Sequence, residues 1–372
     1  MAENQPSTGI RPSAITAGTS SPYLEWAKGE GVPFHTGSAF PDLNTLEVKP
    51  WARFGQKGAL VCPADQEVDD GWLVEIAPGG QTEIQHHLFE SSTYVLAGRG
   101  ATTIWQKGSD RKQTVEWQQG SLFSPPINCY YQHFNLDGQN PARLYAATTC
   151  PLQMNISRTA DFIFNCDYVF ADRFNPTDDF FSKTGQSAGM RRWHTNLVPD
   201  LRTFKLEDWR ERGTGSSNMF FSMSSNAMSA HVSEFPVGSY KKAHRHMTGA
   251  HVILLNGVGY SLLWFAGEKE RRKVDWKAGT LFSPKDAEYH QHFNTGTTPA
   301  RYLAFTFGRM VITNSNEIAM GADVSEKDGG WQIEYEDQDP EVHAIFETEC
   351  RQNGAAVTLP TPSYRNRVAA AR

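Results

Sequence analysis

Two closely spaced pairs of histidines are the residues whose types and spacing point most directly to chemistry. His244 and His246 are separated by one residue, and so are His290 and His292. Because alternate residues of a β-strand face the same side, two strands of a small barrel could direct all four imidazoles to one interior point. A single buried histidine is more often a hydrogen-bonded core residue, but clustered imidazoles suit iron, manganese, nickel, copper or zinc. The pattern therefore predicts a metal site.

These histidines belong to an internal repeat with a constant offset of 159 residues. Matching glycine, proline, tryptophan and histidine positions relate the segments 87–100, 117–125 and 130–135 to the segments 246–259, 276–284 and 289–294. Most of the chain consists of short runs rich in Val, Ile, Tyr, Phe and Trp between clusters of turn residues, which is typical of all-β sandwiches and barrels. A constant offset over such a stretch indicates two copies of one fold.

The repeat divides the chain into five segments. We expect an N-terminal arm (1–30), a first barrel (31–150), a connector (151–192), a second barrel (193–310) and a C-terminal segment (311–372). A short amphipathic helix is predicted in the last of these by the apolar residues Val342, Ile345, Phe346 and Cys350. The two ends of the chain are expected either to be loose or to pack on a partner subunit.

The composition excludes several classes of protein. The 372-residue chain has 35 basic and 41 acidic residues, a net charge of −6 and no long basic run, which argues against nucleic acid or an anionic membrane as the main partner. Its five cysteines are scattered and form no CxxC pair, so a disulfide framework or a cysteine zinc site is not expected. The first residues lack the pattern of a signal peptide. We therefore expect a cytoplasmic protein, and one that forms homo-oligomers.

One combination of spacings is specific enough to indicate a family. The second copy contains the series Gly238, His244, His246, Gly257, Gly279, Pro284, His290 and Asn294. This series resembles the two sequence motifs of the cupin superfamily, and its duplication makes the chain similar to a bicupin. The resemblance implies an all-β fold of two tandem cupin barrels (double-stranded β-helices, or jelly rolls), with short helices in the connector and in the C-terminal segment.

The resemblance also assigns roles to the histidines. It implies that His244, His246 and His290 are the metal ligands and that His292 lines the pocket as a substrate-contacting or proton-transferring residue. Many cupins supply a glutamate as a fourth ligand, but the corresponding positions here are Ala250 or His251, depending on the alignment. His251 is therefore either an additional ligand or an outward-facing residue. The absence of the glutamate resembles bicupins of the gentisate 1,2-dioxygenase type rather than the oxalate decarboxylase type, which keeps it.

The first copy departs from the ligand pattern. Gln85 and Tyr131 stand where the second copy has His244 and His290, while His87 is retained. An amide is a weak donor, and a phenol must lose a proton with a pKa near 10 before it binds a metal well. We therefore expect the first barrel to be free of metal and to serve as a structural support, a pairing surface or a source of ligand contacts.

The resulting hypothesis is a non-haem Fe(II)-dependent dioxygenase with His292 as a catalytic residue. Three neutral imidazoles leave the metal its full charge and adjacent open positions, an arrangement that suits O2 together with a small anionic chelating substrate such as an aromatic hydroxy acid. Manganese, nickel or zinc are alternatives to iron. Two other functions stay open: a metal-dependent decarboxylase, lyase or isomerase that does not use O2, and a non-catalytic bicupin that binds a small molecule.

Overall fold

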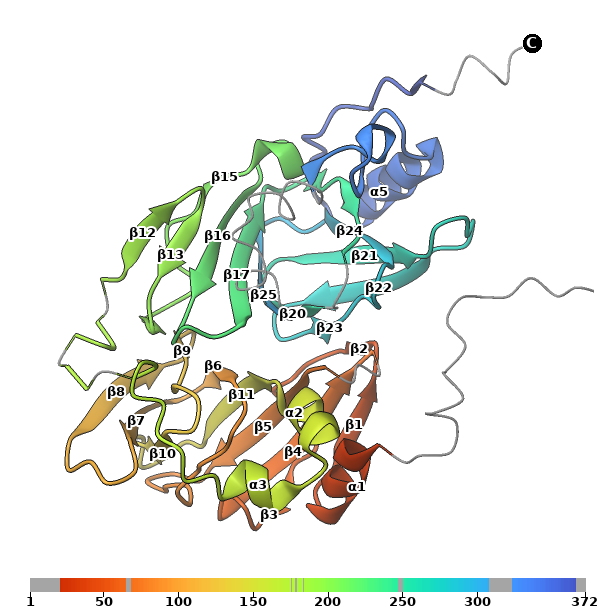
Figure 1. Cartoon of the computed structure of the whole chain (residues 1–372). Coiled ribbons are helices and arrows are strands. Elements are labelled where there is room, and N and C mark those ends of the chain that lie inside the picture. The colour runs from red at the N-terminus through yellow and green to blue at the C-terminus, as the bar shows by residue number, and fades with distance from the viewer. Residues whose placement is uncertain are drawn as a thin grey trace, which may run out of the picture.

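The chain folds into two β-barrels that pack against each other (Figure 1). The computed structural model describes residues 21–64, 68–174, 176–177, 179–182, 184–246, 250–307 and 323–365. Strands dominate both barrels, and helices are few and short. The predicted fold class, two tandem jelly-roll barrels with short helices between and after them, is confirmed.

The first barrel consists of two sheets. Its strands are β1 (Phe34–Gly37), β3 (Lys49–Trp51), β4 (Gln56–Pro63), β5 (Asp70–Ile76), β6 (Ser91–Ala97), β7 (Arg99–Trp105), β8 (Lys112–Gln118), β9 (Leu122–Phe123), β10 (Tyr130–Asn135) and β11 (Ala142–Thr148). One sheet has the order β1-β4-β5-β11-β6-β9, with β3 beside β4, and the other has the order β10-β7-β8.

The second barrel repeats this plan. Its strands are β12 (Gln186–Gly189), β13 (Arg192–His194), β15 (Glu207–Asp208), β16 (Ser217–Ser222), β17 (Met228–Phe235), β18 (Ser239–Tyr240), β19 (Ala243–His244), β20 (Ala250–Asn256), β21 (Val258–Trp264), β22 (Arg272–Lys277), β23 (Leu281–Phe282), β24 (Tyr289–Asn294), β25 (Ala300–Phe307) and β26 (Gln332–Ile333). Strands β6, β7, β9 and β10 correspond to β20, β21, β23 and β24 at the 159-residue offset. The sequence repeat is thus a repeat of strands.

The repeated glycines have a structural cause. Gly98 and Gly257 form the β6–β7 and β20–β21 turns with φ of 88° and 95°, a region that side chains disfavour. At Gly100 and Gly259 a Cβ atom would lie 2.1 and 1.9 Å from a carbonyl oxygen of the neighbouring strand. Both positions therefore require glycine in both copies.

Each barrel contributes a strand to a sheet of the other. Strand β2 (Ala39–Phe40) precedes the first barrel's main strands but pairs with β23 of the second. Strand β14 (Leu197–Val198) belongs to the second copy and pairs with β9 of the first. An apolar cluster drawn from both copies fills the space between the barrels, with Leu73, Tyr145, Phe221, Ile253 and Leu303 among its members.

A buried arginine holds each exchanged segment in place. Arg143 on β11 donates to the carbonyl oxygens of Leu43 (3.0 Å) and Leu46 (2.6 Å), which follow β2, and pairs with Glu75 at 2.9 Å. Arg301 on β25 makes the equivalent bonds to the carbonyls of Leu201 and Phe204, which follow β14. The two guanidinium groups therefore satisfy backbone acceptors that would otherwise be buried without a donor.

Helices α1 (Pro22–Gly29), α2 (Cys150–Ser157) and α3 (Ala160–Phe164) pack against the first barrel, and α5 (Pro340–Gln352) packs on the outer side of β21 and β24. The connector contains α2 and α3. In the C-terminal segment, α5 matches the predicted amphipathic helix. Its N-cap residue is Asp339, whose side chain accepts a hydrogen bond from the backbone N–H of Glu341. Sequence analysis missed α1, whose Tyr23 and Ala27 pack into the first barrel's core. This part of the N-terminal arm therefore packs on the first barrel of the same chain. No helix in the described ranges has the length and apolarity needed to cross a bilayer.

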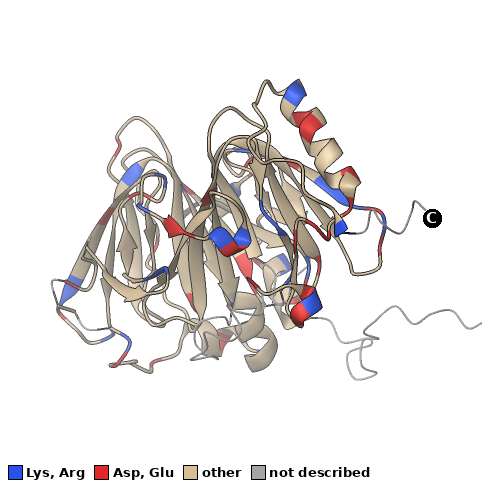
Figure 2. Cartoon of the chain, turned by 90° about the horizontal axis from the view of Figure 1, so that it is seen from above, with Lys and Arg blue, Asp and Glu red and all other residues tan. Residues whose placement is uncertain are grey.

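Charged residues of both signs are distributed over both barrels. In the view of Figure 2, lysine and arginine segments lie among aspartate and glutamate segments, and helix α5 carries both signs.

Replacing Arg143 with methionine should lower the free energy of unfolding by about 3 kcal/mol, because two buried carbonyls and Glu75 lose their donor. Both barrels should still unfold in one transition, because the pairing of β14 with β9 and the apolar cluster between the barrels continue to join them. Chemical denaturation followed by tryptophan fluorescence and circular dichroism measures both quantities. Lys57→Met is the matched control: Lys57 pairs with the same Glu75 at 3.6 Å but is exposed, so its loss should cost about 0.5 kcal/mol or less. Two separate transitions in the native chain would contradict the interlocked arrangement.

Candidate metal centre

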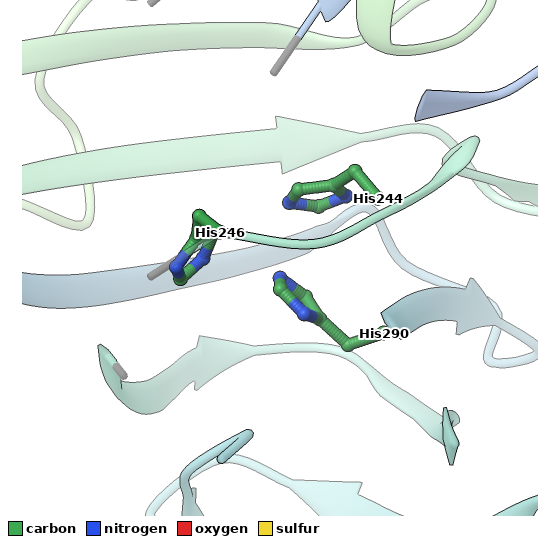
Figure 3. A group of neighbouring side chains, drawn as sticks. All are labelled: His244, His246 and His290. Atoms are coloured by element: carbon green, nitrogen blue, oxygen red, sulfur yellow. The ribbon is translucent and has the colours of Figure 1, made fainter. Parts of the chain in front are cut away.

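Three histidines converge inside the second barrel. His244 and His246 come from β19 and the residues after it, His290 comes from β24, and the three rings face one another (Figure 3). One ligand atom of each residue lies within 4.8 Å of those of the other two. All three are at least nine-tenths buried, and no cysteine or carboxylate completes this group in the described part of the chain. The structure thus brings together the three residues that the family resemblance implied as ligands.

Backbone carbonyls orient two of these rings. Nδ1 of His290 lies 3.1 Å from the carbonyl oxygen of Glu288, and Nδ1 of His244 lies 3.4 Å from that of Lys242. A carbonyl only accepts, so each Nδ1 must carry the hydrogen, which leaves the lone pair on Nε2. Burial, followed by the charge of Arg212, lowers the pKa of His244 well below its ordinary value. Neutral imidazoles with an unprotonated Nε2 are the form that binds a divalent metal.

His292 lies beside this group but its ring is held by a different contact. Its Nδ1 is 2.8 Å from Oγ of Ser261, which accepts a hydrogen bond from the indole of Trp276 at 3.0 Å. The ring centroid lies 5.5 Å from that of His290. The first barrel contains the same arrangement, in which Trp117 donates to Thr102 and Thr102 contacts His133 at 2.7 Å. The indole–hydroxyl–imidazole chain is therefore a feature of the scaffold in both barrels.

His251 lies elsewhere. It is fully buried on β20, but its ring points toward the first barrel, where Nδ1 is 3.0 Å from the hydroxyl of Tyr145 and Nε2 is 3.4 Å from a carboxylate oxygen of Asp69. The strand alternation that directs Ala250 and Val252 into the second barrel turns His251 outward. The sequence left open whether His251 is an additional ligand or an outward-facing residue. In the structure it faces outward from the second barrel, where it contacts the first barrel and not solvent.

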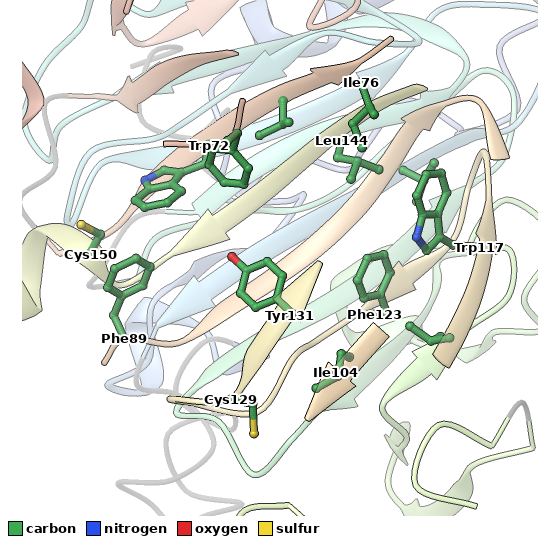
Figure 4. Packing of buried hydrophobic residues seen from close by; sticks show 14 of the residues in the cluster. Trp72, Ile76, Phe89, Ile104, Trp117, Phe123, Cys129, Tyr131, Leu144 and Cys150 are labelled. Atoms are coloured by element: carbon green, nitrogen blue, oxygen red, sulfur yellow. The ribbon is translucent and has the colours of Figure 1, made fainter. Parts of the chain in front are cut away.

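The equivalent position in the first barrel is filled by protein contacts. His87 donates from Nδ1 to the carbonyl of Phe89 (3.0 Å) and accepts the hydroxyl of Tyr131 at Nε2 (2.9 Å). The amide of Gln85 donates to the carbonyls of Arg53 and Glu83. Burial lowers the pKa of His87 to about 3. Tyr131 lies in an apolar interior with Trp72, Phe89 and Phe123 (Figure 4), which favours the proposal that this barrel is a structural support.

Sequence analysis missed a group of polar residues in the second barrel. Lys241 and Arg212 are completely or almost completely buried there, and Lys241 donates to the hydroxyl of Tyr302 at 3.0 Å. A signal for two of them was present, because the first copy has Thr82 and Leu144 where the second has Lys241 and Tyr302. Inward-facing positions at which the two copies have different residue types therefore indicate where the second interior differs from the first.

No protein-family model matches the chain, and no curated protein matches its sequence. Solved structures do match. A glutamate-to-alanine mutant of oxalate decarboxylase from Bacillus subtilis is 15% identical with a TM-score of 0.52, covering 78% of this chain and 82% of that one. An arginine-to-alanine mutant of the same enzyme is 14% identical with a TM-score of 0.51, covering 87% and 88% of the two chains.

A further structure of the enzyme, at pH 4.6, is 15% identical with a TM-score of 0.50 and covers 73% of this chain and 76% of that one. The chain has the bicupin fold. At this level of identity the likeness concerns the arrangement of strands, so a choice between the gentisate dioxygenase and oxalate decarboxylase types depends on the site of this chain itself.

The purified bicupin should bind about one equivalent of divalent metal per chain, and replacing His244, His246 or His290 with alanine should remove most of it, because each is one of three donors. Elemental analysis after removal of loosely bound metal measures the content. Tyr131→Phe is the control at the equivalent position of the first barrel and should leave the content unchanged. Two equivalents per chain, or metal retained when both His244 and His246 are replaced, would show that the assignment is wrong.

Proposed function

We propose that this bicupin is a metal-dependent enzyme that acts on a small carboxylic acid inside the second barrel. The observation that carries the proposal is the placement of two buried cations in the same interior as the three-histidine group. A donor set of neutral imidazoles and a pair of buried cations both favour a negatively charged ligand.

Within the described residues, only some of the hydrogen-bond donors of Arg212 have an acceptor. Arg212 donates from Nη2 to Asp323 at 2.9 Å, whereas its Nε and Nη1 make no hydrogen bond within the described residues. The ammonium group of Lys241 lies among the rings of Trp209, Phe235 and Tyr302. Burial, followed by the charge of Arg212, lowers the pKa of Lys241 well below its ordinary value. An anion beside these groups would supply both hydrogen-bond acceptors and the missing negative charge.

A continuous series of contacts joins the cations to the histidines. The ring of His292 lies 5.5 Å from that of His290 and 5.2 Å from that of Tyr302, whose hydroxyl accepts from Lys241. His231, 6.0 Å from the ring of Tyr302, borders the same interior. This series favours a substrate that reaches the three histidines with one end and the cations with the other.

A divalent metal is the group that fits the three histidines, because their orientation leaves Nε2 of His244 and His290 without a proton. His244, His246 and His290 would hold it, and it would act as a Lewis acid or, if it is Fe(II), as a site for O2. Lys241 and Arg212 would bind and orient a carboxylate. Burial, followed by the charge of His290, lowers the pKa of His292 well below its ordinary value. His292 would transfer a proton or hold a substrate oxygen.

Two reaction classes are consistent with this site. The first is a non-oxidative conversion, such as a decarboxylation, lyase reaction or isomerisation, and it is supported by the two-barrel fold shared with oxalate decarboxylase. The second is the Fe(II)-dependent dioxygenase reaction on an aromatic hydroxy acid, and it is supported by a ligand group that contains no carboxylate. Iron, manganese, nickel and zinc all remain in the proposal, since imidazole ligands alone do not select among them.

Turnover of small carboxylic and aromatic hydroxy acids by the metal-loaded bicupin should distinguish the two classes. For the non-oxidative reaction we expect the same rate with and without O2, because the metal only polarises the substrate. Product analysis together with an oxygen electrode measures both. Oxygen consumption that equals substrate loss, with no turnover under strict anaerobiosis, would instead establish the dioxygenase. Absence of turnover for every acid with every metal would contradict the proposed function.

Replacing His292 with alanine should preserve the metal content and lower kcat by about 100-fold, because the group that transfers the proton is lost. Metal analysis and steady-state kinetics on the same preparation measure the two effects. His133→Ala removes the equivalent indole–hydroxyl–imidazole chain from the first barrel and should leave kcat unchanged. Equal losses of kcat in the two variants would mean that His292 supports the scaffold only.

A further inference from the structure

The outer face of the second barrel carries a stack of two aromatic rings with a cation at each end, directly behind the proposed metal centre. The guanidinium carbon of Arg245 lies 4.9 Å from the ring centroid of Tyr289, the Tyr289 and Trp264 rings stack at 5.6 Å and 20°, and Arg271 lies 5.4 Å from the Trp264 ring. We refer to these four residues as the outer stack. Such contacts are attractive because the ring face is electron-rich.

The outer stack is repeated in the first barrel at the same offset. His86 stacks on Tyr130 at 4.3 Å and 9°, Tyr130 stacks on Trp105 at 5.8 Å and 16°, and Lys112 lies 4.2 Å from the Trp105 ring. Each of these residues precedes its counterpart in the outer stack by 159 positions. The first barrel therefore offers the same stack without three converging histidines behind it.

The outer stack joins the two segments that supply the ligands. Arg245 stands between His244 and His246, and Tyr289 immediately precedes His290. Because side chains alternate along a strand, ligands that face inward leave Arg245 and Tyr289 facing outward. Their contact thus spans, on the outer side, the same two segments that the metal would join on the inner side.

Backbone pairing between these segments is denser before His244 than after it. Strand β18 pairs with β24 at Ser239–Asn294 and Tyr240–Phe293, and the N–H of Lys241 donates to the carbonyl of His292 at 3.0 Å. Strand β19 has two residues, and its pairing with β24 consists of His244 opposite His290. Beyond it, the backbone N–H of Ala287 donates to the carbonyl of His246 at 2.9 Å. Among the described residues the backbone pairing thus becomes sparser toward His246, which leaves the Arg245–Tyr289 contact a share in placing His246 relative to His290.

The C-terminal segment closes over the outer stack. The hydroxyl of Tyr289 donates to Glu326 at 2.5 Å, Arg271 pairs with Asp339 at 3.2 Å, and the backbone N–H of Arg245 donates to the carbonyl of Trp331 at 3.1 Å. Three of the contacts that fix the outer stack thus come from residues after the second barrel.

We propose that Arg245 is a positioning residue for the metal centre, acting through its contact with Tyr289 to hold the His244–His246 segment at the correct distance from His290. The proposal rests on the metal centre proposed above. It predicts that metal affinity depends on the planar shape of the guanidinium group and not on its charge. The charge alone would oppose the binding of a cation, so removing it would strengthen metal binding if electrostatics dominated.

The test measures the Co(II) affinity of the full chain by competition with a chelator at fixed pH, together with the Co(II) ligand-field spectrum. We expect Arg245→Ala to weaken binding about tenfold and to change the spectrum, as is typical when a contact that orients ligands is lost. Arg245→Lys keeps the charge without the planar group and should weaken binding to an intermediate extent. If Arg245→Ala does not fold, the Co(II) affinity of Arg245→Lys tests whether Arg245 positions the ligands.

His86→Ala is the matched control, because it removes the equivalent stacking contact from the first barrel. It should lower thermal stability by an amount similar to that of Arg245→Ala and leave Co(II) affinity and spectrum unchanged. Unchanged or tighter Co(II) binding by Arg245→Ala would overturn the positioning role. No Co(II) binding by the native chain would instead overturn the metal centre itself, so the two failures are distinguishable.

Discussion

The pairing of β2 with β23 and of β14 with β9 is the interaction on which the rest of the structure depends. An unpaired strand edge exposes backbone N–H and C=O groups, and burying such an edge without partners is costly. Each barrel here completes a sheet of the other, and Arg143 and Arg301 bind the carbonyls of the segments that follow. The apolar cluster between the barrels is therefore enclosed by strands from both copies, so the second barrel's interior is built on the first barrel's stability.

The two barrels differ in the residues that fill their interiors, and the dependence of one barrel on the other gives a physical reason for this difference. Trp72, Phe89 and Tyr131 fill the first interior with rings, which provide most of the apolar burial there. The second interior contains imidazoles, Lys241 and Arg212, whose desolvation opposes folding. A chain that carries buried cations in one barrel benefits from a well-packed partner barrel that is interlocked with it.

The proposed centre combines an inner and an outer set of residues on the same two segments. The inner set consists of the histidine ligands, two of which are oriented by backbone carbonyls. The outer set begins with Arg245 and Tyr289 and is covered by the C-terminal segment through Glu326 and Asp339. The alternation of side chains in a strand makes the two sets neighbours along the backbone, and this is the basis of the positioning role proposed for Arg245.

The sequence alone predicted two equivalent barrels, because a constant offset of 159 residues repeats the same turns in both copies. Strand alternation predicted that His244 and His246 share one face and that His290 and His292 share another, because alternation depends only on spacing along one strand. The meeting of the two strands was implied by the resemblance to cupins. Only the tertiary structure decided which residues meet from distant segments. It placed Lys241 and Tyr302, 61 positions apart, at 3.0 Å, and it turned His251 toward the first barrel. Such contacts depend on which strands become neighbours and on the docking of two barrels, neither of which the order of residues in a single strand contains.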